Sequence, residues 1–164
     1  MLMYVINVLS AHLTKEPVMK KMATTVLAAA LALGAQAAMA DAEKSIEYRQ
    51  SVFKVVKWHM DPLGGMARGM VEYDADKALH HARQLSALSH MPLEGFGPGT
   101  EGGDSKAEIW AKWDMFAGGM EKFQADSAAL VAAAEVGTLE ALRPAVGQLG
   151  QTCKGCHDSF RVPR

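Results

Sequence analysis

Apolar residues recur at three- and four-residue spacings in four stretches of this chain, all of them after residue 41. This spacing places them along one face of an α-helix, and no stretch sustains the strict alternation of a half-buried strand. The sequence therefore predicts an all-α domain. Because the connections are short apart from one long loop, we predict an antiparallel four-helix bundle.

The ends of the first two helices are marked by residue type. The first helix is expected to stop near Pro62 and the Gly64-Gly65 pair, since proline and glycine both interrupt helices. The second is expected to begin at an N-cap, Asp74, and to end before Pro92. The inward faces of these two helices carry Ile46, Arg49, Val52, Phe53, Val56 and Met60, and then Ala78, Leu79, Ala82, Leu85 and Leu88.

The third and fourth helices follow the long loop. Ser105 and Glu108 match a capping box, and the third helix is expected to run from there to about Gly137. The fourth contains Pro144, which should distort it locally. Their inward faces carry Ile109, Trp113, Phe116, Met120 and Phe123, and then Leu139, Leu142, Val146, Leu149, Cys153, Cys156, His157 and Phe160.

The first 40 residues have the composition of a leader. From Met19 the chain reads Met-Lys-Lys-Met, followed by an apolar run at residues 23–35 and by Ala38-Met39-Ala40. These are the three regions of a secretory signal peptide, and the apolar run is shorter than the roughly 20 residues of a membrane span. We predict translation from Met19, cleavage after Ala40 and a mature domain at residues 41–164 that has no membrane anchor. An uncleaved anchor is the alternative.

Composition is ordinary for one folded domain. The chain has 164 residues, 49% of them hydrophobic and 21% charged, with a formal net charge of -1. Three lysines and one acid lie in the first 40 residues, which leaves 14 basic and 17 acidic residues, net -3, in the rest. Nucleic-acid binding needs clustered Lys and Arg to neutralise phosphates, so that class of function is excluded.

The only two cysteines of the chain lie in Cys153-Lys154-Gly155-Cys156-His157. Cys-x-x-Cys-His is the pattern of c-type haem attachment, in which the thiols reach two porphyrin vinyl groups and the histidine reaches the iron. A thioredoxin-like dithiol would need a βαβ context, and a zinc site would need more Cys or His at ligand spacing. We predict one haem c bound through Cys153 and Cys156, with His157 as axial iron ligand.

Three blocks together resemble class II c-type cytochromes, specifically the cytochrome c′ family, over residues 43–164. They are residues 48–51 (Tyr-Arg-Gln-Ser), residues 95–104 with Ile109-Trp110 after them, and residues 153–161. Pro144 and the Gly64-Gly65 pair depart from the family pattern and leave the local helix shape open. The resemblance implies a periplasmic four-helix bundle and a homodimer formed through its first two helices.

The resemblance also implies roles for residues around the haem. Low-spin relatives supply a methionine from the first helix, at the position that Phe53 occupies here, so a five-coordinate, high-spin iron is expected. Arg49 is expected to pair with a haem propionate. Arg161 is expected beside His157, where its charge would weaken the iron–histidine bond. Each could instead be a structural residue, Phe53 in the core and the two arginines in surface contacts.

The expected function is reversible binding of a diatomic gas, NO or CO, with one-electron redox cycling in exchange with periplasmic redox partners. The alternative is a low-spin electron carrier whose sixth ligand is Met60 or His59, although helix rise places both about 10 Å beyond Phe53. Peroxidase or NO reductase activity is disfavoured because peroxide cleavage usually needs a distal acid–base group. The chain is therefore not expected to be an enzyme.

Some features are expected to carry no chemistry. Residues 97–102 match the dinucleotide fingerprint, but they follow a helix where that site needs a strand, so we predict a loop. His80, His81 and His90 are interpreted as separate surface residues, since adjacent helical side chains splay apart. Trp110 and Trp113 are assigned to the core.

Overall fold

The computed structural model describes the backbone of residues 16–163 and the side chains of residues 39 and 41–163. It divides into two compact units, one ending at Asp41 and the other beginning at Ala42. Residues 1–18 precede the predicted start at Met19, and of these only the backbone of 16–18 is described. The side chains of the apolar run at residues 23–35 also lie outside the described residues. The leader and its cleavage after Ala40 therefore stay predictions.

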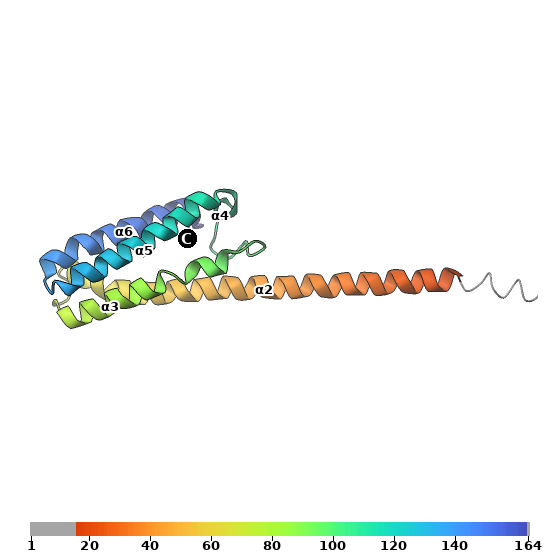
Figure 1. The fold of residues 1–164 in the computed structure, drawn as a ribbon, viewed down its shortest axis with the longest axis horizontal. Coiled ribbons are helices and arrows are strands. Elements are labelled where there is room, and N and C mark those ends of the chain that lie inside the picture. Colours follow the sequence, from red (N-terminus) through yellow and green to blue (C-terminus); the bar gives the residue numbers. More distant parts are fainter. Residues whose placement is uncertain (1–15, 164) are drawn as a thin grey trace, which may run out of the picture. The chain divides into compact units, whose positions relative to one another are not determined.

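The elements follow the chain in the order α2 (Glu16–Ala67), α3 (Ala75–Leu88), the 3₁₀ helix η1 (Pro92–Phe96), α4 (Glu108–Ala111), α5 (Trp113–Glu135) and α6 (Leu139–Phe160). In the second unit, residues 42–67 of α2 lie beside α3, α5 and α6, and successive helices run in opposite directions (Figure 1). This is the predicted all-α four-helix bundle. Among the residues described, no helix is long and apolar enough to cross a membrane.

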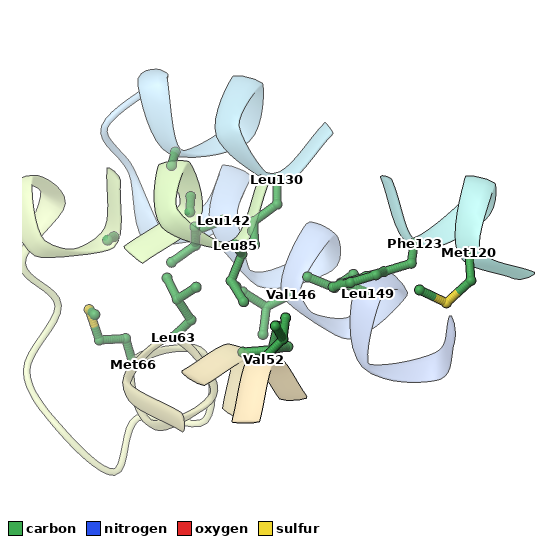
Figure 2. Packing of buried hydrophobic residues seen from close by; sticks show 14 of the residues in the cluster. Val52, Leu63, Met66, Leu85, Met120, Phe123, Leu130, Leu142, Val146 and Leu149 are labelled. Carbon is green, nitrogen blue, oxygen red and sulfur yellow. The ribbon is translucent and has the colours of Figure 1, made fainter. Parts of the chain in front are cut away.

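The core lies along the axis of this bundle. Leu63 of α2, Leu85 of α3, Leu130 of α5 and Leu142 of α6 are completely buried, and their side chains converge in Figure 2. Burying a leucine side chain contributes about 1.5–3 kcal/mol, so this layer is a main source of stability. The three- and four-residue spacing of the apolar residues thus predicted Leu85 and Leu142 correctly, whereas Leu63 and Leu130 were not among the expected inward residues.

The first bundle helix does not stop at Pro62. α2 continues through Pro62 to Ala67, so the expected end is wrong. Proline within a helix costs about 3 kcal/mol, but Leu63 and Met66 beyond it are 0% and 3% exposed. Burial of these two side chains offsets the cost.

α2 ends at Ala67, two residues before Gly69, whose φ of 71° is in the left-handed region that favours glycine. Met70 N–H donates to Gly65 O at 2.9 Å, and Arg143 Nε of α6 donates to Ala67 O at 2.8 Å. The last carbonyls of the helix are thereby partnered.

The other predicted helix starts have mixed outcomes. Asp74 caps α3 as predicted, accepting a hydrogen bond from Lys77 N at 3.0 Å. The capping box is wrong, because α4 starts after Ala107 with no side-chain cap. Ser105 instead pairs with Arg161 in an isolated antiparallel bridge.

The third predicted helix is broken into α4 and α5 at Lys112, whose φ of -126° and ψ of 46° are not helical. Trp110 of α4 is half-buried and donates from Nε1 to Phe96 O at 3.1 Å, whereas Phe116 of α5 is buried. The break at Lys112 lets Trp110 bind the loop through its hydrogen bond while Phe116 enters the core. Trp113, assigned to the core from the sequence, is 38% exposed.

Candidate haem site

The cysteine motif lies in the last turns of α6, an uninterrupted helix that starts at the N-cap Thr138 and runs through Pro144. Cys153 and Cys156 are three residues apart, so their side chains share one face of the helix. Both are half-buried free thiols packed against the core. Burial raises the pKa of each, so both are protonated at neutral pH.

This environment distinguishes the interpretations of the motif. A redox-active dithiol needs a thiol whose pKa is lowered, and here the pKa of both thiols is raised. A zinc site needs further ligands, and among the described residues no group of three or more His, Cys, Asp or Glu includes either cysteine. Two neutral thiols and an adjacent imidazole remain, which is the donor set that fits a covalently attached haem.

His157 is exposed, so its predicted place on the buried face is wrong. At about 100° per residue it lies about 60° around α6 from Phe160, which is 6% exposed. The imidazole is therefore at the edge of the apolar face. It lines a surface hollow together with Lys106, Asp158, Arg161 and the two residues that follow Arg161.

Arg161 is held next to His157 by the loop before α4. The guanidinium Nη2 of Arg161 lies 3.6 Å from Asp104 Oδ2. The backbone N–H of Arg161 donates to the backbone carbonyl of His157 at 3.1 Å. Val162 N–H donates to Asp104 O, and Lys106 N–H to Phe160 O, both at 2.9 Å. The family resemblance predicted Arg161 beside His157; the sequence did not indicate that Asp104 lies next to the guanidinium.

Phe53 of α2 is half-buried and packs against the core, to which the buried Val52 and Val56 of the same helix also belong. Its level in the bundle follows from Met60, whose Cε lies 4.0 Å from where a Cβ would stand on Gly150. Since α2 and α6 run in opposite directions (Figure 1), seven residues back along α2 correspond to seven residues forward along α6. Phe53 therefore lies toward the end of α6 that carries the cysteine motif, and Met60 lies about 10 Å from it along α2.

Arg49, one turn before Phe53, is 2% exposed and contacts the loop after η1. Nη1 donates to Gly95 O at 2.6 Å and to Thr100 O at 2.7 Å, and Nη2 donates to Gly102 O at 2.9 Å. Residues 97–102 form a loop, as predicted. Arg49 therefore fastens the loop to α2, and its pairing with a propionate stays a prediction.

Aromatic rings and a glycine complete this contact. The Arg49 guanidinium carbon lies 4.5 Å from the centre of the Phe96 ring and 5.6 Å from that of Trp110. A Cβ on Gly95 would stand 2.8 Å from Arg49 Cβ, so only glycine allows the loop to approach α2 this closely. Burial lowers the pKa of Arg49, yet guanidinium stays charged at any ordinary pH.

A polar contact between α5 and α6 lies beside Cys153. Thr152 Oγ1 donates to Asp126 Oδ2 at 2.5 Å, and Lys122 Nζ lies 2.9 Å from the same oxygen. Burial acts to raise the pKa of Asp126, but hydrogen bonds from Thr152, Lys122 and Gln148 outweigh it and lower the pKa. The Lys122–Asp126 spacing was visible in the sequence as a helical ion pair; the link to Thr152 required the tertiary structure.

The comparisons with known proteins agree with this arrangement. The family model for cytochrome c′ matches residues 44–161. The cytochrome c′ of Halomonas halodenitrificans is 42% identical over 131 residues, which covers 75% of this chain and 99% of the relative. The cytochrome c′ of Cereibacter sphaeroides is 45% identical over 140 residues, covering 81% of this chain and 93% of the relative.

A solved structure has the same fold. It is a nitric oxide complex of a leucine-to-alanine variant of cytochrome c prime from Alcaligenes xylosoxidans. Its TM-score is 0.72 at 37% identity, and the match covers 75% of this chain and 97% of that one. The chain therefore belongs to the cytochrome c′ family of four-helix-bundle haem proteins and carries one covalently attached haem c.

Proposed function

We propose that this chain is a periplasmic haem protein that binds NO or CO at an open coordination position of the iron and exchanges single electrons with periplasmic redox partners. The observation that carries the proposal is that Phe53 packs against the core on the part of α2 that lies toward the cysteine motif of α6. A phenyl ring has no lone pair to give to a metal. Relatives support the choice of ligand, since the similar Alcaligenes structure is a nitric oxide complex.

The attachment is assigned to the motif on α6. Cys153 and Cys156 would each hold the haem by adding the thiol S–H across one vinyl group, so that a thioether forms and nothing is released. Both thiols are half-buried beside the apolar core, where a porphyrin can replace solvent. His157, at the edge of the same face, would supply a nitrogen ligand to the iron.

The apolar surroundings of Phe53 account for the choice of gas. Its buried neighbours on α2, Val52 and Val56, offer no hydrogen-bond donor. Bound O₂ depends on such a donor for stability, whereas NO and CO depend on it less. We therefore assign Phe53 the role of covering the distal face and limiting what binds there.

Arg161 is assigned to the proximal side. Its charge, oriented by Asp104 at 3.6 Å, lies in the hollow that His157 also lines. A cation there disfavours imidazolate character in His157 and weakens its bond to a metal. Arg161 would therefore make His157 a weaker and more easily released ligand of the iron.

Export and assembly belong to the same proposal. The leader at residues 19–40 directs the chain to the periplasm, where members of this family generally function. A homodimer through α2 and α3 is supported by two apolar side chains one turn apart on α2, Val55 and Trp58, which are 43% and 72% exposed. Family members are generally not classed as enzymes, and we assign no catalytic residue.

The absorption spectrum of the mature protein, ferric and ferrous, with and without NO, tests the function. We expect high-spin spectra that change when NO is added, and a matched change with CO in the ferrous state. A low-spin spectrum that NO leaves unchanged would identify a sixth protein ligand, Met60 or His59, and a plain electron carrier.

A further inference from the structure

Three histidines that the sequence separates meet on the surface between α2 and α3. His59 comes from α2, and His80 and His81 are consecutive on α3. One ligand nitrogen from each lies within 4.8 Å of the others. The interpretation of His80 and His81 as separate surface residues is therefore wrong; His90, outside the group, is exposed.

The rings are close because His59 lies against both residues of the pair. His59 Nδ1 is 2.9 Å from His81 Nδ1. The centroid of the His59 ring lies 6.0 Å from that of His80 and 5.2 Å from that of His81, and the His80 and His81 centroids are 5.3 Å apart. His59 of α2 thus contacts both His80 and His81, whose side chains would point apart on an isolated helix.

From this geometry we propose that His59, His80 and His81 bind one divalent transition-metal ion of the Zn²⁺ class, outside the haem site. Zinc–imidazole bonds are 2.0–2.1 Å long, so two ligand nitrogens on one tetrahedral zinc stand about 3.3 Å apart. His59 and His81 are already near this separation. His80 is exposed and can turn its ring inward.

The chemistry of the group selects the metal. Imidazole suits Zn²⁺, Cu²⁺ and Ni²⁺, whereas Mg²⁺ and Ca²⁺ prefer the oxygen ligands that this group lacks. Burial lowers the pKa of His59 and of His81, with neighbouring imidazoles adding to the effect. A metal binds the neutral form of imidazole. Three protein ligands leave a fourth position for water.

Titration of the haem-loaded protein with Zn²⁺, followed by calorimetry, tests the site. We expect one Zn²⁺ per chain and no binding of Mg²⁺. Removing a group that only hydrogen-bonds to a metal ligand already weakens metal binding about 10–100-fold. His80→Gln removes a ligand itself, so it should weaken Zn²⁺ binding by at least about tenfold. Because His80 is exposed, this variant should keep the fold. His59→Gln should have the same effect, and His90→Gln should have none.

Thermal unfolding gives a second measurement, since a metal that links α2 to α3 stabilises the folded state. Zn²⁺ should raise the unfolding midpoint of the wild type and of His90→Gln, and leave that of His80→Gln unchanged. The haem absorption should stay constant during the titration. Absence of binding in the wild type would mean that the three rings only pack together, with one hydrogen bond between His59 and His81. Unchanged affinity in His80→Gln would place the metal elsewhere. Either result overturns the proposal.

Discussion

Arg49 shows how one buried cation can organise a loop. Its guanidinium donates to the carbonyls of Gly95, Thr100 and Gly102, which belong to a segment about 50 positions along the chain. Hydrogen bonds from a charged donor contribute about 1.5–3 kcal/mol each, and carbonyls left buried without a donor cost about 1–3 kcal/mol each. A single side chain thus determines where the loop lies against α2.

Replacing this side chain should therefore be costly. We expect Arg49→Ala to lower the free energy of unfolding by about 3 kcal/mol or more, measured by urea denaturation of the haem-loaded protein. Arg83→Ala is the matched control, because the Arg83 side chain is 59% exposed in its pair with Glu135. An exposed pair contributes about 0–1 kcal/mol. Equal losses in both variants would contradict the structural role of Arg49.

Phe53 is the residue on which the proposed gas binding depends. We expect Phe53→Met to supply a thioether ligand to the iron, so that the ferric spectrum becomes low-spin. NO affinity should fall by at least about tenfold, which corresponds to ~1.4 kcal/mol. Phe53→Leu, which adds no ligand, should keep the high-spin spectrum. A high-spin Phe53→Met protein would mean that position 53 does not face the iron.

At the scale of the helices, the pairing of α5 with α6 beside the cysteines depends on a polar contact. Asp126 accepts hydrogen bonds from Lys122 on its own helix and from Thr152 and Gln148 on α6. Its side chain is only 13% exposed, so the contact is protected from water. It holds the helix that carries Cys153 at a defined height against α5.

The lowered pKa of Asp126 makes this contribution depend on pH. A carboxyl whose pKa is lower in the folded state stabilises the protein above its unfolded-state pKa, and the stabilisation is lost as the pH falls through the folded-state value. Asp126→Asn should therefore cost about 1 kcal/mol at pH 7, and the difference from wild type should shrink on acidification.

The exposed Lys57–Asp61 pair on α2 has the same four-residue spacing and provides the control. Urea denaturation at neutral and acidic pH should show little effect of Asp61→Asn at either pH, because an exposed pair contributes little. A cost of Asp126→Asn that does not vary with pH would show that shape rather than charge matters at this position.

At the scale of the whole molecule, the mature protein is expected to consist of residues 41–164 with one haem. Ala38-Met39-Ala40 has the small residues that signal peptidases require at the cleavage site. Intact-mass analysis of the exported protein should show a chain that begins at Asp41 and carries the added mass of one haem. A mass that includes residues 19–40 would indicate an uncleaved anchor.

Much of the bundle could be predicted from the sequence because it depends on local periodicity. The inward faces of α3 and α6 and the N-cap Asp74 follow from residues at most a few turns apart. The end of α2 could not be predicted this way. Pro62 is a strong local signal, but Leu63 and Met66 bury themselves against other helices, and that gain was not visible locally.

In the candidate site, too, the features that depend on nearby residues could be predicted from the sequence. The sequence by itself determined the haem motif, because two cysteines and a histidine in five consecutive residues carry their chemistry on one helical turn. It also determined the four amphipathic helices, because burial of one apolar face requires only the right spacing. These features depend on neighbours in the chain.

Only the tertiary structure decided which distant residues meet. It placed Arg49 against Gly95 and Thr100, Asp126 against Thr152, and His59 against His80 and His81. Such pairs depend on the relative height and rotation of packed helices, which are set by the fit of many core side chains at once. No spacing along one helix contains that information, because each helix can supply only one side of the contact.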